Sequence, residues 1–428
     1  MGQICNVALL GFGTVGSSVA KILCERSNTR LRLTHILNRN VERKKVDWLP
    51  STVRWTENID DVLSSDVEIV VELMGGLQPA EDWIRRALSA GKSVVTANKQ
   101  LIARCGPELT ALARQMKQQI QFGASVAGGV PVISGLHEGL AGDDLFQIRG
   151  ILNGTCNYIL SQIEANGIPF ATALSEAQKL GFAEADPTED IDGLDARAKL
   201  AILARVGLHC NVKLESIVAR SISPIDSVDF EYAQQLGCTI RQISWAELKN
   251  GQLFAAVQPA LVELSSPLAR VEGSQNLVVA TGKYGGETVF GGHGAGGHPT
   301  AVAVVSDILA ITSSKQATVA MTKTTADPTI ASASLAEMTP TVTANFTAKH
   351  YLRFLVKDRP GIIAALATIL SECHINIDAV LQKPGCPKSH LPFLITLEEC
   401  NASLVEKALH QINALNFLVQ PCLHLPIL

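Results

Sequence analysis

The chain has few aromatic residues and no long uninterrupted apolar run. Phe, Trp and Tyr make up 5% of its 428 residues, while apolar residues make up 47% and glycine occurs 33 times. This balance excludes fibrous and disordered chains and is typical of α/β proteins rich in Ala, Val and Leu. The longest apolar stretches, such as residues 301–311, are too short to span a bilayer. We therefore expect two to four packed domains and no membrane partner.

An excess of charge of one sign is also absent. The 36 basic and 40 acidic residues give a net charge of -4, and basic clusters extend little beyond residues 43–45, which argues against nucleic acid as a partner. Met1 leads directly into a strand-like segment rather than into the zones of a signal peptide, so we expect a cytoplasmic protein. The ten cysteines show neither CxxC pairs nor metal-ligand spacing, which favours reduced, buried thiols over disulfides.

The first 130 residues have the pattern of a Rossmann-type α/β domain. Residues 4–10 form a short apolar run that predicts a buried strand, and residues 17–24 are helical in pattern. Strand-like runs follow at 31–37, 68–73, 93–96 and 119–123, with a helix at 80–90 that Gly91 ends. This alternation predicts a parallel sheet covered on both faces.

A second, α+β domain is expected over residues 131–297. Helices are predicted near 131–140 and 191–206, and strands at 146–152, 253–264 and 276–281. The helical run 300–312 is expected to pack back on the first domain, so we assign residues 298–318 to it.

Residues 319–348, rich in Ser, Thr and Ala, are predicted to be a linker. The final domain, 349–428, has strands at 351–356, 375–381 and 392–397 and helices at 362–372 and 403–413. That order predicts a ferredoxin-like fold.

A dinucleotide site is indicated by the segment Gly11-Phe12-Gly13-Thr14-Val15-Gly16, which lies between a predicted strand and a predicted helix. Glycines there allow a tight turn, and the helix N-terminus offers N–H groups to a pyrophosphate. The alternative is a glycine-rich turn without a ligand.

The second predicted strand ends in Asn38-Arg39-Asn40, where NAD-preferring sites usually carry an acid. Arg39 has the fork geometry to pair with a 2′-phosphate, which favours NADP, with NAD still possible. Arg39 could instead be an ordinary solvated arginine.

A run of acidic residues ends at Lys199. If the segment from residue 191 is helical, Asp195 and Lys199 lie at i and i+4 on one face, and Glu184 in the preceding loop could fold over them. Carboxylates beside a lysine could bind an α-ammonium group and move a hydroxyl proton. A solvated helix with one ion pair is the alternative.

The whole stretch from Ala177 to Lys199 resembles the signature of the homoserine dehydrogenase family, with its Asp186-Pro187, its Asp190-Ile-Asp192-Gly193-Leu-Asp195 and the final lysine. Further family-like motifs occur in order along the chain: Glu72-Leu-Met-Gly-Gly76, Val94-Val-Thr-Ala-Asn-Lys99, Ser125-Val-Ala-Gly-Gly129 and Asn153-Gly-Thr155. The resemblance implies interconversion of L-homoserine and aspartate semialdehyde.

The resemblance also implies residue roles. Lys199 matches the proton donor and acceptor, and Lys99 the lysine that contacts cofactor and substrate. The substrate positions are Thr155, Glu184, Asp190 and Asp195, and further cofactor contacts are Gly181, Glu184 and Gly296.

Gly123 departs from the family pattern, because the family commonly has a glutamate there that helps to hold a structural sodium ion. Backbone carbonyls matching Val126, Gly128 and Val130 complete that site. With the anionic ligand gone, we expect the sodium site to be weaker or empty.

Cys156 suggests a rival function, an acylating aldehyde dehydrogenase with a thiol nucleophile, although a buried structural cysteine is the alternative. A catalytically silent NADP-binding amino-acid sensor is a third possibility.

The C-terminal domain resembles the ACT family, which binds small amino acids, usually across a dimer interface. The resemblance rests on Lys357-Asp358-Arg359-Pro360-Gly361 and on Ile375-Asn376-Ile377-Asp378. It implies effector contacts at Asp358, Pro360, Gly361 and Asn376, and L-threonine as an inhibitor by family analogy. A homodimer or homotetramer is expected, and the domain could serve oligomerisation alone.

Overall fold

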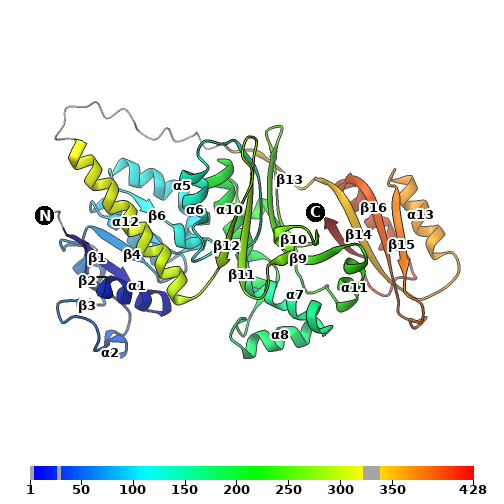
Figure 1. The fold of residues 1–428 in the computed structure, drawn as a ribbon, viewed down its shortest axis with the longest axis horizontal. Helices are drawn as coiled ribbons and strands as arrows, with labels where there is room; N and C mark the ends of the chain where they lie inside the picture. Colours follow the sequence, from blue (N-terminus) through cyan, green and yellow to red (C-terminus); the bar gives the residue numbers. More distant parts are fainter. Residues whose placement is uncertain (1–3, 27–29, 322–337) are drawn as a thin grey trace. The chain divides into compact units, whose positions relative to one another are not determined.

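The computed structural model describes residues 4–26, 30–321 and 338–428, with side chains described outside 316–321 (Figure 1). The chain forms two compact units. The first comprises Met1–Leu145, Ala201–Leu214 and Gly282–Thr339, and the second comprises Phe146–Leu200, Glu215–Thr281 and Pro340–Leu428. Most of the predicted linker, 319–348, lies outside the described residues.

The first unit is built on a six-stranded sheet with the order β3-β2-β1-β4-β5-β6, and every strand pair is parallel. Its strands are β1 (Cys5–Leu10), β2 (Leu31–Leu37), β3 (Arg54–Thr56), β4 (Ile69–Glu72), β5 (Ser93–Thr96) and β6 (Ile120–Gln121). This order is that of the Rossmann fold, as predicted. The chain reverses direction across the sheet between β1 and β4, where such folds bind dinucleotides at the carboxyl ends of the strands.

Helices cover this sheet: α1 (Thr14–Glu25), α2 (Val41–Lys44), α3 (Ile59–Leu63), α4 (Ala80–Ser89), α5 (Lys99–Gln115), η1 (Gly123–Ser125), α6 (Val132–Ser134), η2 (Gly135–Gly139) and α12 (Gly297–Met321). The strand predicted over 119–123 is shorter than expected because η1 begins at Gly123. The helix predicted over 300–312 is longer. It packs Ala301, Val304 and Ile308, at spacings of three and four residues, into the core around β1.

The second unit contains a long sheet whose order is β11-β7-β9-β10-β17-β14-β16-β15. Its first strands are β7 (Leu145–Ile151), β9 (Cys238–Lys249), β10 (Gln252–Glu263) and β11 (Gln275–Gly282), and β8 (Val218–Ala219) and β13 (Thr341–Thr343) pair with β10. Strand β12 (Gly286–His293) lies in the first unit. Strands β9 and β10 form a hairpin that turns at Asn250 and Gly251, both with positive φ. Asn-Gly favours such turns.

The helices of this part are α7 (Gly154–Asn166), α8 (Phe170–Lys179), α9 (Thr188–Ile191), α11 (Ser227–Gln235), η4 (Pro267–Arg270), the first half of α10 (Leu194–Leu208) and most of η3 (Leu214–Ser216). The segment Ala201–Leu214 belongs to the first unit. The single helix predicted from residue 191 is instead two helices, α9 and α10. Gly193 separates them with φ +76°, a conformation that glycine adopts without strain. A Cβ at that position would lie 2.9 Å from Cγ1 of Val257, so space also requires glycine.

The C-terminal domain has the predicted ferredoxin-like order, completed by a final strand that the sequence pattern had not indicated. Its elements are β14 (Thr347–Val356), α13 (Ile362–Glu372), β15 (Ile377–Gln382), β16 (Leu391–Asn401), α14 (Ala402–Ile412) and β17 (Leu423–Ile427). Strand β17 pairs with β10 at Leu261 and Ile427, so one sheet runs through both parts of the second unit. Tyr351, Leu394 and Leu425 pack in one core with α7 and α11.

Across the three described segments, no helix is both long enough and apolar enough to cross a membrane.

Candidate active site

The glycine loop after β1 has the tight geometry that the sequence motif predicts. Gly11 has φ +106°, and a Cβ on it would lie 2.9 Å from the carbonyl oxygen of Leu73. A Cβ on Gly16 would lie 2.2 Å from the carbonyl oxygen of Gly11. Side chains at either position would therefore push α1 away from the sheet.

Gly13 differs, because a Cβ there would meet nothing within 4 Å. It is the N-cap of α1, and no side chain caps the helix. The cap residue therefore satisfies none of the first N–H groups of α1, such as those of Thr14 and Val15, as an anion site at a helix start requires. Phe12 is buried instead, with its ring 4.9 Å from that of Trp55 in an edge-on contact.

The turn after β2 presents Arg39 to solvent. Asn38 is engaged locally, since its Oδ1 accepts a 3.1 Å hydrogen bond from the N–H of Phe12. Asn40 then takes a left-handed conformation with φ 59°. The turn therefore leaves the Arg39 guanidinium accessible at the carboxyl end of β2.

Glu72, at the end of β4, is fully buried and organises the next two loops. Its Oε1 accepts from the N–H groups of Met74 (2.8 Å) and Gly75 (3.1 Å), and its Oε2 accepts from the Thr96 hydroxyl (2.6 Å). These bonds fix the loop after β4 to the end of β5. The sequence motifs contain both residues, but their contact depends on the sheet.

Lys99 is the first residue of α5, at the carboxyl end of β5. Asn98 immediately before it caps the helix by accepting from the N–H of Leu101 (3.2 Å). Its Nδ2 also donates to the carbonyl of Gly76 (2.6 Å). Lys99 thus directly follows a residue whose side chain is fixed by two hydrogen bonds. Lys99 itself is partly buried.

A second helix begins close to the glycine loop. Gly296, with φ +121°, is exposed just before α12. A Cβ on Gly297 would lie 2.9 Å from Oγ of Ser18 in α1, so the start of α12 approaches the start of α1 closely.

In the second unit, Lys199 of α10 is held by two acceptors. Its Nζ donates to Oδ2 of Asp195 and to the carbonyl oxygen of Leu152, both at 2.7 Å. Side-chain exposure is 14% for Lys199 and 9% for Asp195, so the pair is shielded from water rather than solvated. The alternative of an ordinary surface ion pair does not describe this geometry.

Asp190 joins this pair through Asn153, which the sequence analysis did not select as a site residue. The Asn153 amide donates to Oδ1 of Asp190 (2.6 Å) and to Oδ2 of Asp195 (2.9 Å). Burial raises the pKa of Asp190, while the bond from Asn153 opposes that rise and the nearby Asp195 carboxylate adds to it. The structure thus brings Asp190, Asp195 and Lys199 together as predicted.

Thr155 lies at the start of α7, and its hydroxyl donates to the carbonyl of Phe182 (2.7 Å). The ring of Phe182 stacks on Tyr158 at 4.6 Å. Both contacts anchor the loop that carries Gly181 and Glu184, which are exposed. Thr155 also lies near the Asp190 carboxyl and lowers its pKa, which places Thr155 beside the acidic cluster.

Cys156 is fully buried, and its Sγ–H donates to the carbonyl of Asp190 (3.1 Å). Burial and the nearby carboxylates raise its pKa well above that of a free thiol. A thiol nucleophile needs the opposite conditions.

The predicted sodium carbonyls belong to Val126, Gly128 and Val130, all buried in the loop after η1. The Val130 carbonyl already accepts from the N–H of Val132 (2.8 Å). Among the residues that the structure describes, no group of three or more His, Cys, Asp or Glu residues could hold a metal.

Gly123 has no side chain, yet a carboxylate lies beside it. Oδ2 of Asp307, from α12, accepts from the N–H of Gly123 (2.8 Å), and a Cβ at Gly123 would lie 2.8 Å from Oδ1 of Asp307. Burial raises the pKa of Asp307 to about 7. α12 therefore places beside Gly123 a carboxyl group that position 123 itself lacks.

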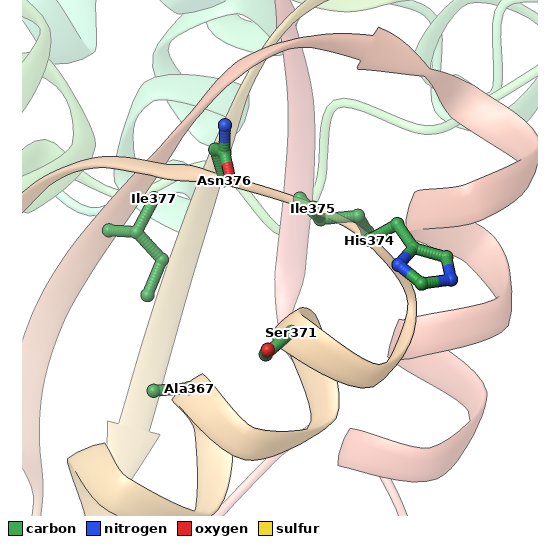
Figure 2. A pocket seen from close by; sticks show the side chains of 6 residues that line it. All are labelled: Ala367, Ser371, His374, Ile375, Asn376 and Ile377. Atoms are coloured by element: carbon green, nitrogen blue, oxygen red, sulfur yellow. The ribbon is translucent and has the colours of Figure 1, made fainter.

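In the C-terminal domain, a cavity of about 430 Å³ lies at the end of α13 (Figure 2). Its lining residues are Ala367, Ser371, His374, Ile375, Asn376 and Ile377. Of the predicted effector residues, only Asn376 lies here, where its Nδ2 donates to Glu398 (3.0 Å). Asp358, Pro360 and Gly361 lie at the opposite end of α13, at its exposed start.

Comparison with known proteins agrees with this geometry. Family models match residues 11–123 (homoserine dehydrogenase, NAD binding domain), 131–309 (homoserine dehydrogenase) and 350–417 (ACT domain). Homoserine dehydrogenase from Bacillus subtilis is 38% identical over 386 residues, covering 89% of this chain and 88% of that protein.

Two solved structures are also similar. A homoserine dehydrogenase from Thiobacillus denitrificans is 32% identical, with a TM-score of 0.89 over 99% of this chain and 98% of that one. A hyperthermophilic archaeal homoserine dehydrogenase in complex with NADPH is 28% identical, with a TM-score of 0.62 over 72% of this chain and 98% of that one. The chain therefore belongs to the homoserine dehydrogenase family, oxidoreductases that act on a CH–OH group, and carries a nicotinamide dinucleotide-binding domain and a C-terminal ACT domain.

Proposed function

We propose that the chain interconverts L-homoserine and L-aspartate 4-semialdehyde with NADP, in the biosynthesis of threonine, methionine and isoleucine. The observation that carries the proposal is the fixed ammonium of Lys199, with two acceptors at 2.7 Å. These two bonds use two of its three hydrogens and direct the third. A lysine held in this way can exchange one proton with a substrate oxygen at a defined position.

During oxidation Lys199, as the neutral amine, takes the hydroxyl proton and becomes the ammonium; during reduction the ammonium gives that proton to the aldehyde oxygen. A bound nicotinamide supplies the hydride acceptor or donor. Asp190 and Asp195 hold the substrate's α-ammonium group, since two shielded carboxylates match one cation. Thr155 and Glu184 complete the polar rim of the substrate site.

The residues of the first unit fit a dinucleotide. The uncapped start of α1, from Gly13 onward, suits the pyrophosphate, and Arg39 suits a 2′-phosphate. Lys99 is proposed to contact both cofactor and substrate, with further cofactor contacts from Gly181, Glu184 and Gly296. The complex of the archaeal relative with NADPH supports NADP as a cofactor.

The test is an initial-rate assay with L-homoserine, using NADP and NAD in parallel. Two analogues serve as controls: 4-hydroxybutyrate, which lacks the α-ammonium group, and L-serine, which is one methylene shorter. We expect turnover with homoserine, preference for NADP and loss of at least 100-fold in kcat/KM with 4-hydroxybutyrate. Equal rates with homoserine and 4-hydroxybutyrate would contradict the role of the carboxylates.

We further propose that L-threonine binds the ACT domain and inhibits the enzyme by favouring one of two states. The cavity has room for a small amino acid, and Asn376 and His374 are among its lining residues (Figure 2). A homodimer or homotetramer is proposed, which light scattering would test.

For sodium, the backbone carbonyls of Val126, Gly128 and Val130 remain the proposed ligands. Asp307 is the carboxylate that could supply the missing negative charge beside Gly123. We propose that any cation there has a structural rather than a chemical role.

The domain boundaries after residues 130, 297, 318 and 348 remain our proposal. We also propose a cytoplasmic location, which cell fractionation would test. The acylating aldehyde dehydrogenase alternative is disfavoured by the burial of Cys156. The silent-sensor alternative fails if the assay above gives turnover.

A further inference from the structure

We propose that Asn153 is a positioning residue of the active site, which fixes Asp190, Asp195 and Lys199 relative to one another through a single amide. The proposal rests on the proposed role of Lys199 in proton transfer. Asn153 opens one of the family-like motifs, but the resemblance gives it no role. It is 4% exposed, so it would act through its neighbours rather than on the substrate.

The orientation of the Asn153 amide is determined by its own contacts. Its Oδ1 accepts from the N–H of Cys156 (2.8 Å) at the start of α7, so its Nδ2 must face the carboxylates. Each of the two amide hydrogens then reaches one carboxylate, at 2.6 Å for Asp190 and 2.9 Å for Asp195. Every polar atom of this side chain is therefore in use.

The amide of Asn153 lies between two carboxylates of like charge, and its two hydrogens bridge them. Both carboxylates accept from the same amide, and the charge of Asp195 raises the pKa of Asp190. A group with two hydrogens can bridge them without adding charge, whereas a hydroxyl has one hydrogen and a carboxylate has none. Replacement by serine thus leaves one acid unbridged, and replacement by aspartate adds a third negative charge.

Residues 152–153 are also linked to Lys199. Asp195 receives Nδ2 of Asn153 and Nζ of Lys199 on the same oxygen, Oδ2. The second acceptor of Lys199 is the carbonyl of Leu152, the residue before Asn153. Asn153 therefore bonds one of the two acceptors that hold the ammonium, Asp195, and directly follows the residue that supplies the other.

Helix capping is the competing explanation, because Asn153 is also the N-cap of α7. Asn, Asp and Ser are about equally good N-caps. The variants Asn153→Asp and Asn153→Ser therefore keep the cap and remove the bridge. A pure capping role predicts activity close to wild type for both.

The experiment measures kcat and KM for homoserine and the pH profile of kcat/KM for wild type, Asn153→Asp and Asn153→Ser. Asn58→Asp is the matched control, since Asn58 caps α3 in the first unit by accepting from the N–H of Asp60. Thermal unfolding and NADPH binding are measured for every variant. These two readouts separate a misfolded variant from a mispositioned site.

We expect Asn153→Ser to lower kcat about 10-fold to 100-fold, as lost buried hydrogen bonds to charged groups do, with NADPH binding unchanged. In Asn153→Asp, the pKa of Asp190 should rise further, because a bond that lowers it is replaced by a third negative charge. The groups facing Asp190 are Asp195, Lys199 and Cys156. In the pH profile of kcat/KM for Asn153→Asp, the acidic limb should therefore move to higher pH.

A kcat within twofold of wild type in Asn153→Ser, or an unmoved acidic limb in folded Asn153→Asp, would overturn the proposal. Lys199→Ala distinguishes this failure from failure of the proposed function. If Lys199→Ala keeps full turnover, the proposed role of Lys199 is wrong. If it loses turnover while Asn153→Ser does not, only the positioning role is wrong.

Discussion

Nζ of Lys199 and Oδ2 of Asp195 are 2.7 Å apart on successive turns of α10, and both side chains are largely shielded from water. The spacing of four residues places them on one face of the helix. The charge of the lysine is thereby kept at a fixed point in the second unit.

The variant Asp195→Asn should lower kcat for homoserine oxidation about 10-fold to 100-fold, because a charge-assisted hydrogen bond contributes about 1.5–3 kcal/mol. Steady-state kinetics checks this. Asp186→Asn is the control, since Asp186 is exposed in the preceding loop and bonds Thr188. An equal loss in both variants would contradict a specific role for Asp195.

The variant Arg39→Ala should raise KM for NADP about 10-fold or more and leave KM for NAD nearly unchanged, because only NADP has a 2′-phosphate. Arg32→Ala is the control, as Arg32 is exposed on β2. A parallel rise in KM for both cofactors would count against selection by Arg39.

The variant Cys156→Ala should keep kcat within about twofold, because the thiol is buried and its raised pKa keeps it protonated near neutral pH. Some loss of thermal stability is expected from the small cavity. A loss of turnover in a folded variant would instead support the thioester mechanism.

The variant Asn376→Ala should weaken threonine inhibition at least tenfold while basal kcat stays unchanged, because Asn376 lines the cavity at the end of α13. Removal of the whole ACT domain is a poor test. Tyr351, Leu394 and Leu425 belong to a core shared with α7, and deletion would expose it.

The control for this experiment is Thr368→Ala, an exposed position on α13 outside the cavity lining. Inhibition that persists unchanged in Asn376→Ala would place the effector elsewhere.

The variant Asp307→Asn should lessen the pH dependence of stability. The folded pKa of Asp307, about 7, lies above the ordinary value of 3.8 because of burial. The protonated form therefore favours folding, and this contribution is complete below pH 4 and lost as pH rises through 7. Wild type should lose stability relative to Asp307→Asn between pH 4 and pH 8.

Thermal unfolding across this pH range, in tetramethylammonium chloride and in sodium chloride, measures the difference. A bound sodium ion would reduce the loss in wild type only. A wild type that gains stability over the variant as pH rises without sodium would refute the assignment.

Much of the fold could be predicted because local patterns agree with it. The apolar run before Gly11 and the i, i+4 pair of Asp195 and Lys199 are local signals, and the structure confirms both. The hairpin at Asn250 and Gly251 had an equally local signal that was overlooked. Asn153 before an apolar helical run likewise has the sequence position of an N-cap.

Other features depend on tertiary contacts that no local pattern encodes. Asn153 and Asp190 are 37 residues apart, and Gly123 and Asp307 are 184 apart. The sequence shows that position 123 carries no acidic side chain. It does not show that α12 brings the Asp307 carboxyl group beside that position. The break at Gly193 depends on the close approach of Val257 as well as on glycine itself.

The central claim is that Lys199 transfers the proton in homoserine oxidation. The most direct measurement is kcat of Lys199→Ala with homoserine and NADP, alongside NADPH binding by fluorescence. The account predicts a fall in kcat of about 100-fold to 10,000-fold, the range of general acid–base catalysis, with NADPH affinity retained. Turnover within a few-fold of wild type in a folded, NADPH-binding variant would contradict it.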